Sequence, residues 1–489
     1  MKLERVVEYL EGTASQLSPA LKQSETNSFV IDSREVKAGD VFFALSQPDY
    51  ANNGFNGDFD DATVFVDGAV ESGAIACVVR PDRFEEHRSS LEKYSDRLIF
   101  VEDAVVALQK LAHRIYLDWN KPIVAVTGSA GKTTAKELTA HVLESSGRKV
   151  LKNIKNYNNG LGHPLTVLNL AKDSSYDVAV LEMGMSTPMN EIQRLCRITP
   201  PDVAVELNVL PVHVEHLGSI KNVQKAKAEL VEGMKEGGTA VLNADDDRVL
   251  SMKRLSKGPV ITYGIESLAD VRAVGIKFPR FGETSFVLLT PTGEAYVEFP
   301  LNGRHNILNA LAAASVGHSF GMTVNEIAAS LHTVVPPPQR GEVLHFANNF
   351  TVINDSYNSN PAALLSMVRT LVDGCHNGGR KIVVAGEMLE LGNEQAMIHR
   401  QVGEELASSG IDLLIGVRGL AEQMVDSARA AGIQTTFAAD STEAGDILIN
   451  EVRPGDTILV KGSRGVRTEK VVEKLIENFE LEGKEGVRE

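Results

Sequence analysis

Short runs of apolar residues alternate with amphipathic stretches along most of this chain. The run from Ile123 to Val126 leads into a glycine-containing loop, and then into a helical pattern that Leu138 and Val142 continue. A short apolar run bounded by turn residues is typical of a strand buried on both faces of a parallel sheet. Strand, loop and helix in this order predict an α/β fold in which helices cover the strands.

Changes in the pattern divide the chain into three blocks. Residues 1–120 carry short strands and a helix expected from Asp103 to about Leu117, which predicts a small α/β domain. Residues 121–335 predict a P-loop domain with a mostly parallel sheet and helices on both faces. Residues 336–489 predict a Rossmann-like domain without the glycine fingerprint of an NAD site. The expected strands are 29–31, 41–45, 75–79, 178–181, 203–207, 240–242, 351–353, 381–385, 413–416 and 457–460.

Chain length and one proline run support this division. A chain of 489 residues is longer than one core usually organises, and about 150 residues per domain is typical. Three consecutive prolines at 336–338 cannot continue a helix and favour an extended spacer. We therefore expect a linker or hinge between the second and third blocks.

Composition narrows the classes of function. The chain is 43% hydrophobic and 23% charged, and no apolar run reaches the roughly 18 residues of a membrane span. The early charges at Lys2 and Glu4 do not fit a secretory signal, and the three cysteines are too scattered for a disulfide framework or zinc motif. The net charge of −16 argues against a nucleic-acid surface. These features predict a cytoplasmic protein with small-molecule ligands, without a nucleic-acid or membrane partner.

The segment after the strand at 123–126 has the composition of a phosphate-binding loop. Gly128 and Gly131 let backbone N–H groups approach phosphate oxygens, and Lys132 adds a positive charge. Thr133 can offer its hydroxyl to Mg²⁺ at the positive end of the helix. The loop is shorter than the general P-loop pattern, which would place a glycine at Val126. The alternative is an ordinary strand-to-helix turn with a solvent-facing lysine. The predicted nucleotide-binding residues are Thr127, Gly128, Ser129, Ala130, Gly131, Lys132, Thr133 and Thr134.

Two further side chains follow predicted buried strands. Glu182 ends one strand and His213 lies beyond the end of the next. In α/β sheets, ligands gather at the carboxyl ends of strands, so both residues are candidate magnesium ligands. A carboxylate that caps the next helix, and a structural histidine, are the alternatives.

Lys227 falls on the apolar face of a predicted helix that begins after Ser219. Its neighbours at helical spacing include Val223 and Leu230, whereas Lys225 lines up with Lys221, Glu229 and Glu232 on the face expected in solvent. A buried ammonium is costly unless it is paired, deprotonated or modified. The alternative is a lysine whose stem carries its charge out to solvent.

Three polar segments also stand at the ends of predicted elements. Residues 302–309 begin a helix with His305, Asn306 and Asn309, which can contact a base or ribose. Residues 355–361 follow the first strand of the third block, and residues 461–465 follow its last. Ordinary turns, with asparagine and glycine chosen for their backbone conformations, are the alternative.

In this order, the segments resemble the Mur ligase family of peptidoglycan precursor synthesis. The resemblance covers nearly the whole chain, and the short loop at 127–133 matches the family's P-loop. It implies ATP and Mg²⁺ as cofactors, with two metal sites. It also assigns residues to the site. By resemblance, the catalytic residues are Lys132, Glu182, His213, Lys227 and Asp355, the metal ligands are Thr133, Glu182, His213 and carbamylated Lys227, and the further nucleotide contacts are His305, Asn306, Asn309, Arg340 and Asp355.

The segments at 32–34, 156–159, 355–361, 386–392 and 461–464 resemble one branch of the family, which adds D-alanyl-D-alanine to UDP-N-acetylmuramoyl-tripeptide through an acyl phosphate. This resemblance implies that the first domain binds the UDP-sugar, the second ATP and the third the dipeptide. The chain departs from the pattern at Leu210 and Val212, and residues 46–72 lack the branch's glycine, aspartate and histidine stretch. The implied substrate-binding residues are Ser33, Arg34, Asn156, Asn158, Asn159, Asn358, Asn360, Lys461, Ser463 and Arg464.

The same motifs also fit two alternative functions. One is another ligase of the superfamily, which adds a single amino acid or resembles folylpolyglutamate synthase. The other is a P-loop ATPase switch that drives a partner protein and forms no bond. A switch needs no second metal site facing an acceptor, so Glu182, His213 and Lys227 favour a ligase. We expect a monomer.

Overall fold

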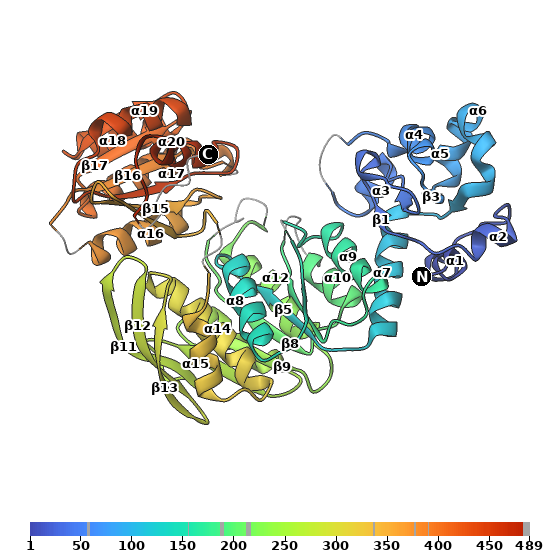
Figure 1. Cartoon of the computed structure of the whole chain (residues 1–489), viewed down its shortest axis with the longest axis horizontal. Helices are drawn as coiled ribbons and strands as arrows, with labels where there is room; N and C mark the ends of the chain where they lie inside the picture. The colour runs from blue at the N-terminus through green and yellow to red at the C-terminus, as the bar shows by residue number, and fades with distance from the viewer. Residues whose placement is uncertain are drawn as a thin grey trace.

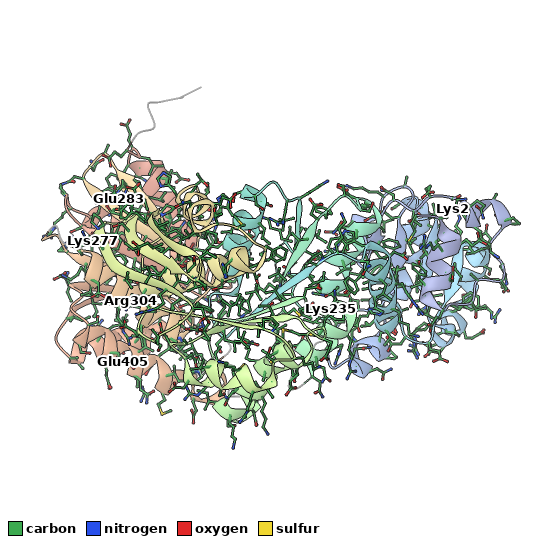
Figure 2. The ribbon with its side chains drawn as sticks, turned by 90° about the horizontal axis from the view of Figure 1, so that it is seen from below. Lys2, Lys235, Lys277, Glu283, Arg304 and Glu405 are labelled. Carbon is green, nitrogen blue, oxygen red and sulfur yellow. The ribbon has the colours of Figure 1, made fainter. Side chains whose placement is uncertain are left out.

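The computed structural model describes residues 1–55, 59–154, 156–185, 190–211, 217–335, 338–375, 378–389 and 391–482. The chain forms three lobes, each built on its own sheet (Figure 1). The molecule is elongated, with Lys2 near one end and Glu405 towards the other (Figure 2). In the described part of the chain, no helix is long and apolar enough to span a bilayer.

The N-terminal lobe contains a parallel four-stranded sheet in the order β1-β2-β3-β4. Its strands are β1 (Phe29–Val30), β2 (Val41–Phe43), β3 (Ala76–Val79) and β4 (Leu98–Phe100). Its helices are α1 (Leu3–Leu10), α2 (Pro19–Lys22), α3 (Gln47–Asn52), α4 (Val66–Glu71), α5 (Pro81–Glu86) and α6 (Arg88–Leu91). Helix α7 (Ala104–Trp119) begins after the cap Asp103, as the sequence predicts, and joins this lobe to the next in one continuous apolar core.

The central lobe contains a nine-stranded sheet in the order β13-β12-β11-β10-β9-β8-β5-β7-β6. The strands from β6 to β11 are parallel, and β12 and β13 add an antiparallel edge. The strands are β5 (Ile123–Thr127), β6 (Val150–Lys152), β7 (Val178–Glu182), β8 (Val203–Glu206), β9 (Thr239–Asn243), β10 (Val260–Gly264), β11 (Val271–Arg280), β12 (Glu283–Thr290) and β13 (Gly293–Phe299).

Helices cover both faces of this sheet, which explains why its strands are apolar on both sides. Ile123 and Ala125 of β5 pack in the core beneath α7, α10 and α12, whereas Val124 and Val126 pack beneath α8, α14 and α15. The helices are α8 (Lys132–Ser145), α9 (Gly162–Val167), α10 (Glu191–Ile198), α12 (Ile220–Glu232), α13 (Asp247–Leu250), α14 (Arg304–Ser319) and α15 (Val324–His332).

The C-terminal lobe contains a six-stranded sheet in the order β14-β15-β19-β16-β17-β18, with β14 antiparallel. Its strands are β14 (Glu342–Phe346), β15 (Phe350–Asp355), β16 (Lys381–Gly386), β17 (Leu413–Val417), β18 (Gln434–Ala438) and β19 (Thr457–Lys461). Its helices are α16 (Pro361–Gly374), α17 (Gln395–Ser408), α18 (Ala421–Ala430), α19 (Ser441–Glu451) and α20 (Glu469–Asn478). The first three helices cover one face of the sheet and the last two cover the other.

One side chain of the central lobe belongs to the core of the C-terminal lobe. Phe281, in the turn between β11 and β12, is buried against α16. A Cβ atom placed on Gly374 of α16 would lie 2.7 Å from the Phe281 ring, so a glycine is needed there for this close packing.

Every predicted strand is present, with ends within two or three residues of the expected positions. The sequence did not reveal β10 to β13, which continue the central sheet. The fold class is confirmed, whereas the boundaries 1–120, 121–335 and 336–489 stay predictions. Pro336 and Pro337 of the predicted linker lie outside the described residues.

Candidate nucleotide and ligation site

The glycine loop between β5 and α8 has the geometry that the sequence predicts. Gly131 caps α8 with a φ of 81°, in the left-handed region that favours glycine. A Cβ atom there would lie 2.7 Å from Oδ1 of Asn309, because α14 packs closely against the loop. The loop can therefore present backbone N–H groups at the amino end of α8, where a helix attracts phosphate.

The residue Asn208, which the sequence analysis did not single out, braces this loop. Its Oδ1 accepts a hydrogen bond from the Ala130 N–H at 2.9 Å, and its Nδ2 donates to the Ala130 carbonyl at 3.1 Å. Ser129 is likewise held internally, because its hydroxyl accepts from the Leu210 N–H at 2.9 Å. Asn208 follows β8, so the adjacent strand fixes the shape of the loop.

The side chains of Lys132 and Thr133 both form hydrogen bonds at the carboxyl ends of central strands. Lys132 donates from Nζ to the Gly128 carbonyl at 3.0 Å, and burial lowers its pKa. Lys132 is half-buried against its own loop and is not the solvent-facing lysine of an ordinary turn. Thr133 donates from Oγ1 to Oε2 of Glu182 at 2.8 Å. A hydroxyl and a carboxylate thus meet at the carboxyl ends of β5 and β7, as Mg²⁺ coordination requires.

Two asparagines fix Glu182. Asn158 donates from Nδ2 to Oε1 of Glu182 at 2.7 Å. Asn153, which the sequence analysis missed, accepts from the Glu182 N–H at 3.0 Å and donates to its carbonyl at 2.9 Å. The carboxylate is 5% exposed, so its orientation is set by these contacts and by Thr133.

Lys227 is buried beneath the site, as its helical position predicts. It is 1% exposed, whereas Lys225 is exposed. Its Nζ lies 3.4 Å from Oγ1 of Thr127. Burial, assisted by the charge of Lys132, lowers the pKa of Lys227 to about 7.

Glu229, expected on the solvated face with Lys225, is buried instead. Its carboxylate accepts hydrogen bonds from the N–H groups of Asn190 and Gln193 at 2.9 and 3.0 Å. It therefore satisfies the amino end of α10, a helix next to its own. The prediction was wrong because a partner on another element decides the burial of this carboxylate.

Glu206 at the end of β8 is a second buried charge near Lys227 that the sequence analysis missed. It is fully buried, and neither carboxylate oxygen has a hydrogen-bond partner among the described residues. Burial raises its pKa well above the usual value, while the charge of Lys227 acts in the opposite direction. The predicted strand at 203–207 is otherwise apolar. Nothing in its pattern, apart from the charged residue type, pointed to a role for Glu206.

The helix α14 brings its polar amino end to the same site. Asn306 donates to the Asn302 carbonyl at 2.8 Å, and Asn309 donates to Oδ1 of Asn306 at 3.4 Å. Burial lowers the pKa of His305 to about 4, which keeps this imidazole neutral at physiological pH. Neutral amides and an imidazole suit a nucleoside better than they suit a phosphate.

The third lobe contributes polar groups from the ends of β15 and β19. Lys461 Nζ forms an ion pair with Oδ2 of Asp355 at 2.5 Å and donates to the Asn358 carbonyl at 2.9 Å. Asn360 caps α16, because its Oδ1 accepts from the Ala363 N–H at 2.9 Å. These contacts shape a polar loop that faces the P-loop.

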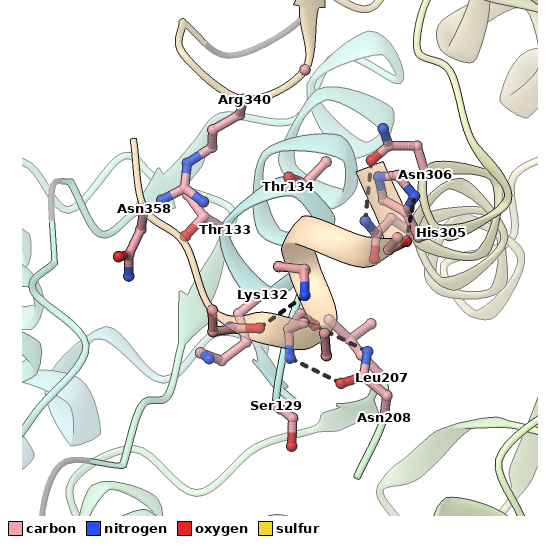
Figure 3. Close-up of a pocket in the computed structure, with 18 of the residues that line it drawn as sticks. Ser129, Lys132, Thr133, Thr134, Leu207, Asn208, His305, Asn306, Arg340 and Asn358 are labelled. Carbon is pink, nitrogen blue, oxygen red and sulfur yellow. Dashed lines mark hydrogen bonds between the residues drawn. The ribbon is translucent and has the colours of Figure 1, made fainter. Parts of the chain in front are cut away.

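All of these elements meet in one cavity of about 410 Å³ (Figure 3). The structure brings together most of the predicted site residues there. The predicted residues that line the cavity are Ser129, Ala130, Gly131, Lys132, Thr133, Thr134, Asn156, Asn158, Glu182, His305, Asn306, Asn309, Arg340, Asp355, Asn358, Asn360 and Lys461. Asn208, Asn243 and Tyr263 also line it and were not predicted.

Other predicted residues lie apart from the cavity lining. Arg34 is exposed on the first lobe beside Ser33 and pairs with Asp32 at 2.6 Å. Asn159 holds the backbone of α9 through its Oδ1. Thr127 and Lys227 lie beneath the loop, and Ser463 and Arg464 follow β19 outside the lining. His213 lies outside the described residues.

Two of the predicted metal ligands, Thr133 and Glu182, contact each other in the part of the chain that the structure describes. Within it, no group of three or more histidine, cysteine, aspartate or glutamate side chains is placed to hold a metal ion. The oxygen donors Thr133 and Glu182 fit one Mg²⁺, which commonly keeps several waters and takes further oxygens from substrate phosphates.

Comparison with known proteins links this site to a family. Family models match the chain for the Mur ligase middle domain at residues 126–317 and for the Mur ligase, glutamate ligase domain at residues 339–464. The UDP-N-acetylmuramoyl-tripeptide--D-alanyl-D-alanine ligase of Escherichia coli K12 is 35% identical over 450 residues, 91% of this chain and 93% of that protein.

Solved structures agree with this result. A crystal structure of MurF from Acinetobacter baumannii matches with a TM-score of 0.84 and 26% identity, over 97% of this chain and 98% of that one. The MurF ligase from Thermotoga maritima in complex with ADP matches with a TM-score of 0.78 and 29% identity, over 94% of this chain and 99% of that one.

Proposed function

The chain belongs to the Mur ligase family, and we propose that it joins D-alanyl-D-alanine to UDP-N-acetylmuramoyl-tripeptide while ATP becomes ADP and phosphate. The observation that carries this function is the single cavity shared by the P-loop and the polar loops after β15 and β19. A ligase must hold its phosphoryl donor and its acceptors in one site, whereas a switch needs only the nucleotide. The reaction supplies peptidoglycan precursors, and we place it in the cytoplasm of a bacterial cell.

The nucleotide occupies the central part of the cavity in this proposal. The backbone of the loop at 128–133 and the Lys132 ammonium hold the phosphates, and Arg340 approaches them from the linker. His305, Asn306 and Asn309 contact the adenosine, with Asp355 on the third-lobe side. The neutral amides of α14 and the cationic groups at the P-loop support this orientation.

Magnesium is proposed at two positions. Thr133 and Glu182 would hold the first ion, because they form a set of oxygen donors at the amino end of α8. His213 and carbamylated Lys227 would hold the second. Bound Mg²⁺ neutralises charge that develops on a transferring phosphoryl group.

Carbamylation of Lys227 is proposed because it removes an unfavourable buried cation. The neutral amine adds to CO₂, a new N–C bond forms, and one proton leaves the nitrogen, so the side chain becomes an anion. The burial of Lys227 next to Thr127 supports this modification, since the side-chain hydrogen bond described for its ammonium is long and the nearby carboxylate of Glu206 offsets the cost of burial only in part.

The proposed reaction has two balanced steps. The terminal carboxylate of the tripeptide attacks the γ-phosphorus of ATP, and ADP leaves, which gives an acyl phosphate. The amine of D-alanyl-D-alanine then attacks the acyl carbon, loses a proton and displaces inorganic phosphate. Lys132 and Arg340 hold positive charge at the cavity in which the phosphoryl group moves.

The remaining polar residues are proposed to position the two acceptors. Ser33 and Arg34 of residues 1–120 would contact the UDP-sugar, and the asparagine loop at 156–159 would contact the peptide. The third domain, residues 336–489, would bind the dipeptide. Its proposed contacts are Asn358, Asn360, Lys461, Ser463 and Arg464. The protein is proposed to act as a monomer on these small molecules.

Phosphate release tests this function. We expect it to require UDP-N-acetylmuramoyl-tripeptide and to rise strongly with D-alanyl-D-alanine, but not with free D-alanine, L-lysine, diaminopimelate or glutamate. Both the lysine and the diaminopimelate forms of the tripeptide are tried. Turnover with a folate and glutamate, or with one free amino acid in place of the dipeptide, would contradict the proposed substrates and leave a ligase of the same family.

Lys132→Ala tests the proposed role of this lysine in phosphoryl transfer. Loss of the fixed cation is expected to reduce ligation by on the order of 10² to 10³. Circular dichroism should show a retained fold, because the side-chain hydrogen bond described for Lys132 lies within its own loop. A variant with more than a tenth of the wild-type rate would remove Lys132 from the phosphoryl-transfer step.

A further inference from the structure

The ring of Tyr357 contacts arginines from two separate segments. Cζ of Arg340, in the linker to the third lobe, lies 4.1 Å from the ring centroid. Cζ of Arg464, in the loop after β19, lies 5.6 Å from it. Guanidinium groups are attracted to an aromatic face at distances below about 6 Å. One ring therefore holds two like charges that would otherwise repel each other.

The two arginines differ in their other contacts. Arg464 donates to Oε1 of Glu469 at 3.0 Å and to Oε1 of Gln339 at 3.4 Å. Arg340 has no hydrogen bond or ion pair with any residue in the described ranges; its contact is the Tyr357 ring. The ring is therefore the main group that fixes the position of the Arg340 head.

The backbone next to Arg340 is also tied to Tyr357. The Gln339 carbonyl accepts a hydrogen bond from the Tyr357 N–H at 3.2 Å. Gln339 has a φ of 61°, a left-handed conformation that costs free energy in a residue other than glycine. The linker thus adopts an unfavourable conformation where it meets Tyr357, and the contacts with this residue compensate for it.

Arg340 points from this anchor into the nucleotide cavity. Arg340 and Tyr357 both line the cavity that contains Lys132. Figure 3 shows the Arg340 side chain extending from the linker into the pocket. The two cations therefore act on the same cavity.

We propose that Tyr357 is a positioning residue, which holds the Arg340 guanidinium over the phosphate end of the cavity and couples its position to the third-lobe loop that carries Arg464. The inference rests on the proposed function, because that function puts nucleotide phosphates at this end. Tyr357 itself takes no part in the chemistry. Because Tyr357 belongs to the third lobe, the position of the Arg340 charge depends on how this lobe packs against the central lobe.

Substitutions that keep or remove the ring test this role. Tyr357→Leu removes the ring, and we expect the Kd of a non-hydrolysable ATP analogue, measured by calorimetry, to rise roughly tenfold, as loss of a partly desolvated cation–π contact implies. Tyr357→Phe keeps the ring face and should recover most of this affinity. Tyr296→Leu, on an exposed tyrosine of β13, is the matched control and should bind like the wild type.

A double-mutant comparison with Arg340 distinguishes a positioning role of Tyr357 from a general structural effect. In an Arg340→Ala background, Tyr357→Leu should weaken analogue binding by less than twofold, because the group that Tyr357 positions is already absent. A full tenfold effect in that background, or a Tyr357→Leu protein that binds like the wild type, would overturn the proposal. So would a Phe variant as weak as the Leu variant.

The readout also distinguishes this inference from the proposed function. Binding of the analogue requires neither the tripeptide nor the dipeptide. If the wild type binds the analogue with the expected Tyr357 dependence but shows no turnover dependent on D-alanyl-D-alanine, the substrate assignment fails and the positioning role stands. Absence of analogue binding in the wild type would overturn both.

Discussion

Two helices of the central lobe each bury a lysine, and the surroundings of the two ammonium groups differ. Lys136 on α8 is 2% exposed and Lys227 on α12 is 1% exposed. Lys136 donates to the Asn153 carbonyl at 2.6 Å and pairs with Oε1 of Glu137 at 2.8 Å. Among the described residues, the Lys227 ammonium has a single side-chain hydrogen bond, which is long, at 3.4 Å to Oγ1 of Thr127.

This difference shows that burial alone does not identify a functional lysine. Lys136 is compensated, and its partner Asn153 also holds the backbone of Glu182, so this lysine stabilises the loop behind the metal position. Around Lys227, burial outweighs the nearby carboxylates of Glu206 and Glu182 and lowers the pKa of the ammonium to about 7, which favours chemical change at its nitrogen. Matched Lys→Met substitutions, which keep length and apolar bulk, separate the two roles.

The largest expected effect is on activity in Lys227→Met. Loss of the proposed metal ligand should lower the ligation rate by on the order of 10² to 10³. The variant should stay folded, because the hydrogen bond that it loses is long, at 3.4 Å. Phosphate release and urea denaturation test the two expectations.

A matched variant and an isotope label complete this experiment. Lys225→Met, on the exposed face of the same helix, should keep the wild-type rate. With ¹³C-bicarbonate, a carbamate carbon resonance should appear in the wild type and in Lys225→Met but not in Lys227→Met. A Lys227→Met enzyme that retains more than a tenth of the rate would show that the two buried lysines do not differ in function.

The next effect is on stability in Lys136→Met. Removing this ammonium leaves the buried Asn153 carbonyl without this donor and leaves Glu137 paired with Lys152 alone, so the free energy of unfolding should fall by about 3 kcal/mol. Urea denaturation of the wild type and both Met variants gives the comparison. Equal stability of the two variants would mean that the partners of Lys136 contribute nothing measurable.

The smallest effect is a pH dependence that Lys227 introduces. Its pKa is about 7 in the folded protein against an ordinary value of 10.5, so between these pH values the unfolded chain binds a proton that the folded protein does not. Raising the pH therefore favours folding in this window. From pH 7 to 9 in CO₂-free buffer, the wild type should gain about 2 kcal/mol relative to Lys227→Met. Parallel stability curves for the two proteins would contradict the lowered pKa.

Much of the fold and the nucleotide site could be predicted because their signals are local. The apolar runs predict the buried strands, and the helical spacing correctly distinguishes buried Lys227 from exposed Lys225. The glycine loop is a contiguous motif, and Glu182 and Asp355 each end a strand, the first in the central sheet and the second in the C-terminal sheet, so each side chain lies at the carboxyl edge of its own sheet.

The features that could not be predicted depend on partners distant in sequence. Glu229 is buried because it caps α10, and Asn208 is part of the site because β8 lies beside β5. Asn158, which stays a predicted substrate contact, also holds Glu182 through its amide, and no sequence pattern indicated that second role. Each partner is set by packing between elements, which one-dimensional patterns do not encode.

The burial of Phe281 in the C-terminal lobe has a consequence for the modularity of the chain. A fragment beginning at residue 338 would lack an aromatic side chain of its own core, and the space beside Gly374 and α16 would be empty. Removing a large aromatic from a core typically costs about 3 to 5 kcal/mol. The C-terminal lobe is therefore not a self-sufficient folding unit of full stability, and the central lobe supplies part of its interior.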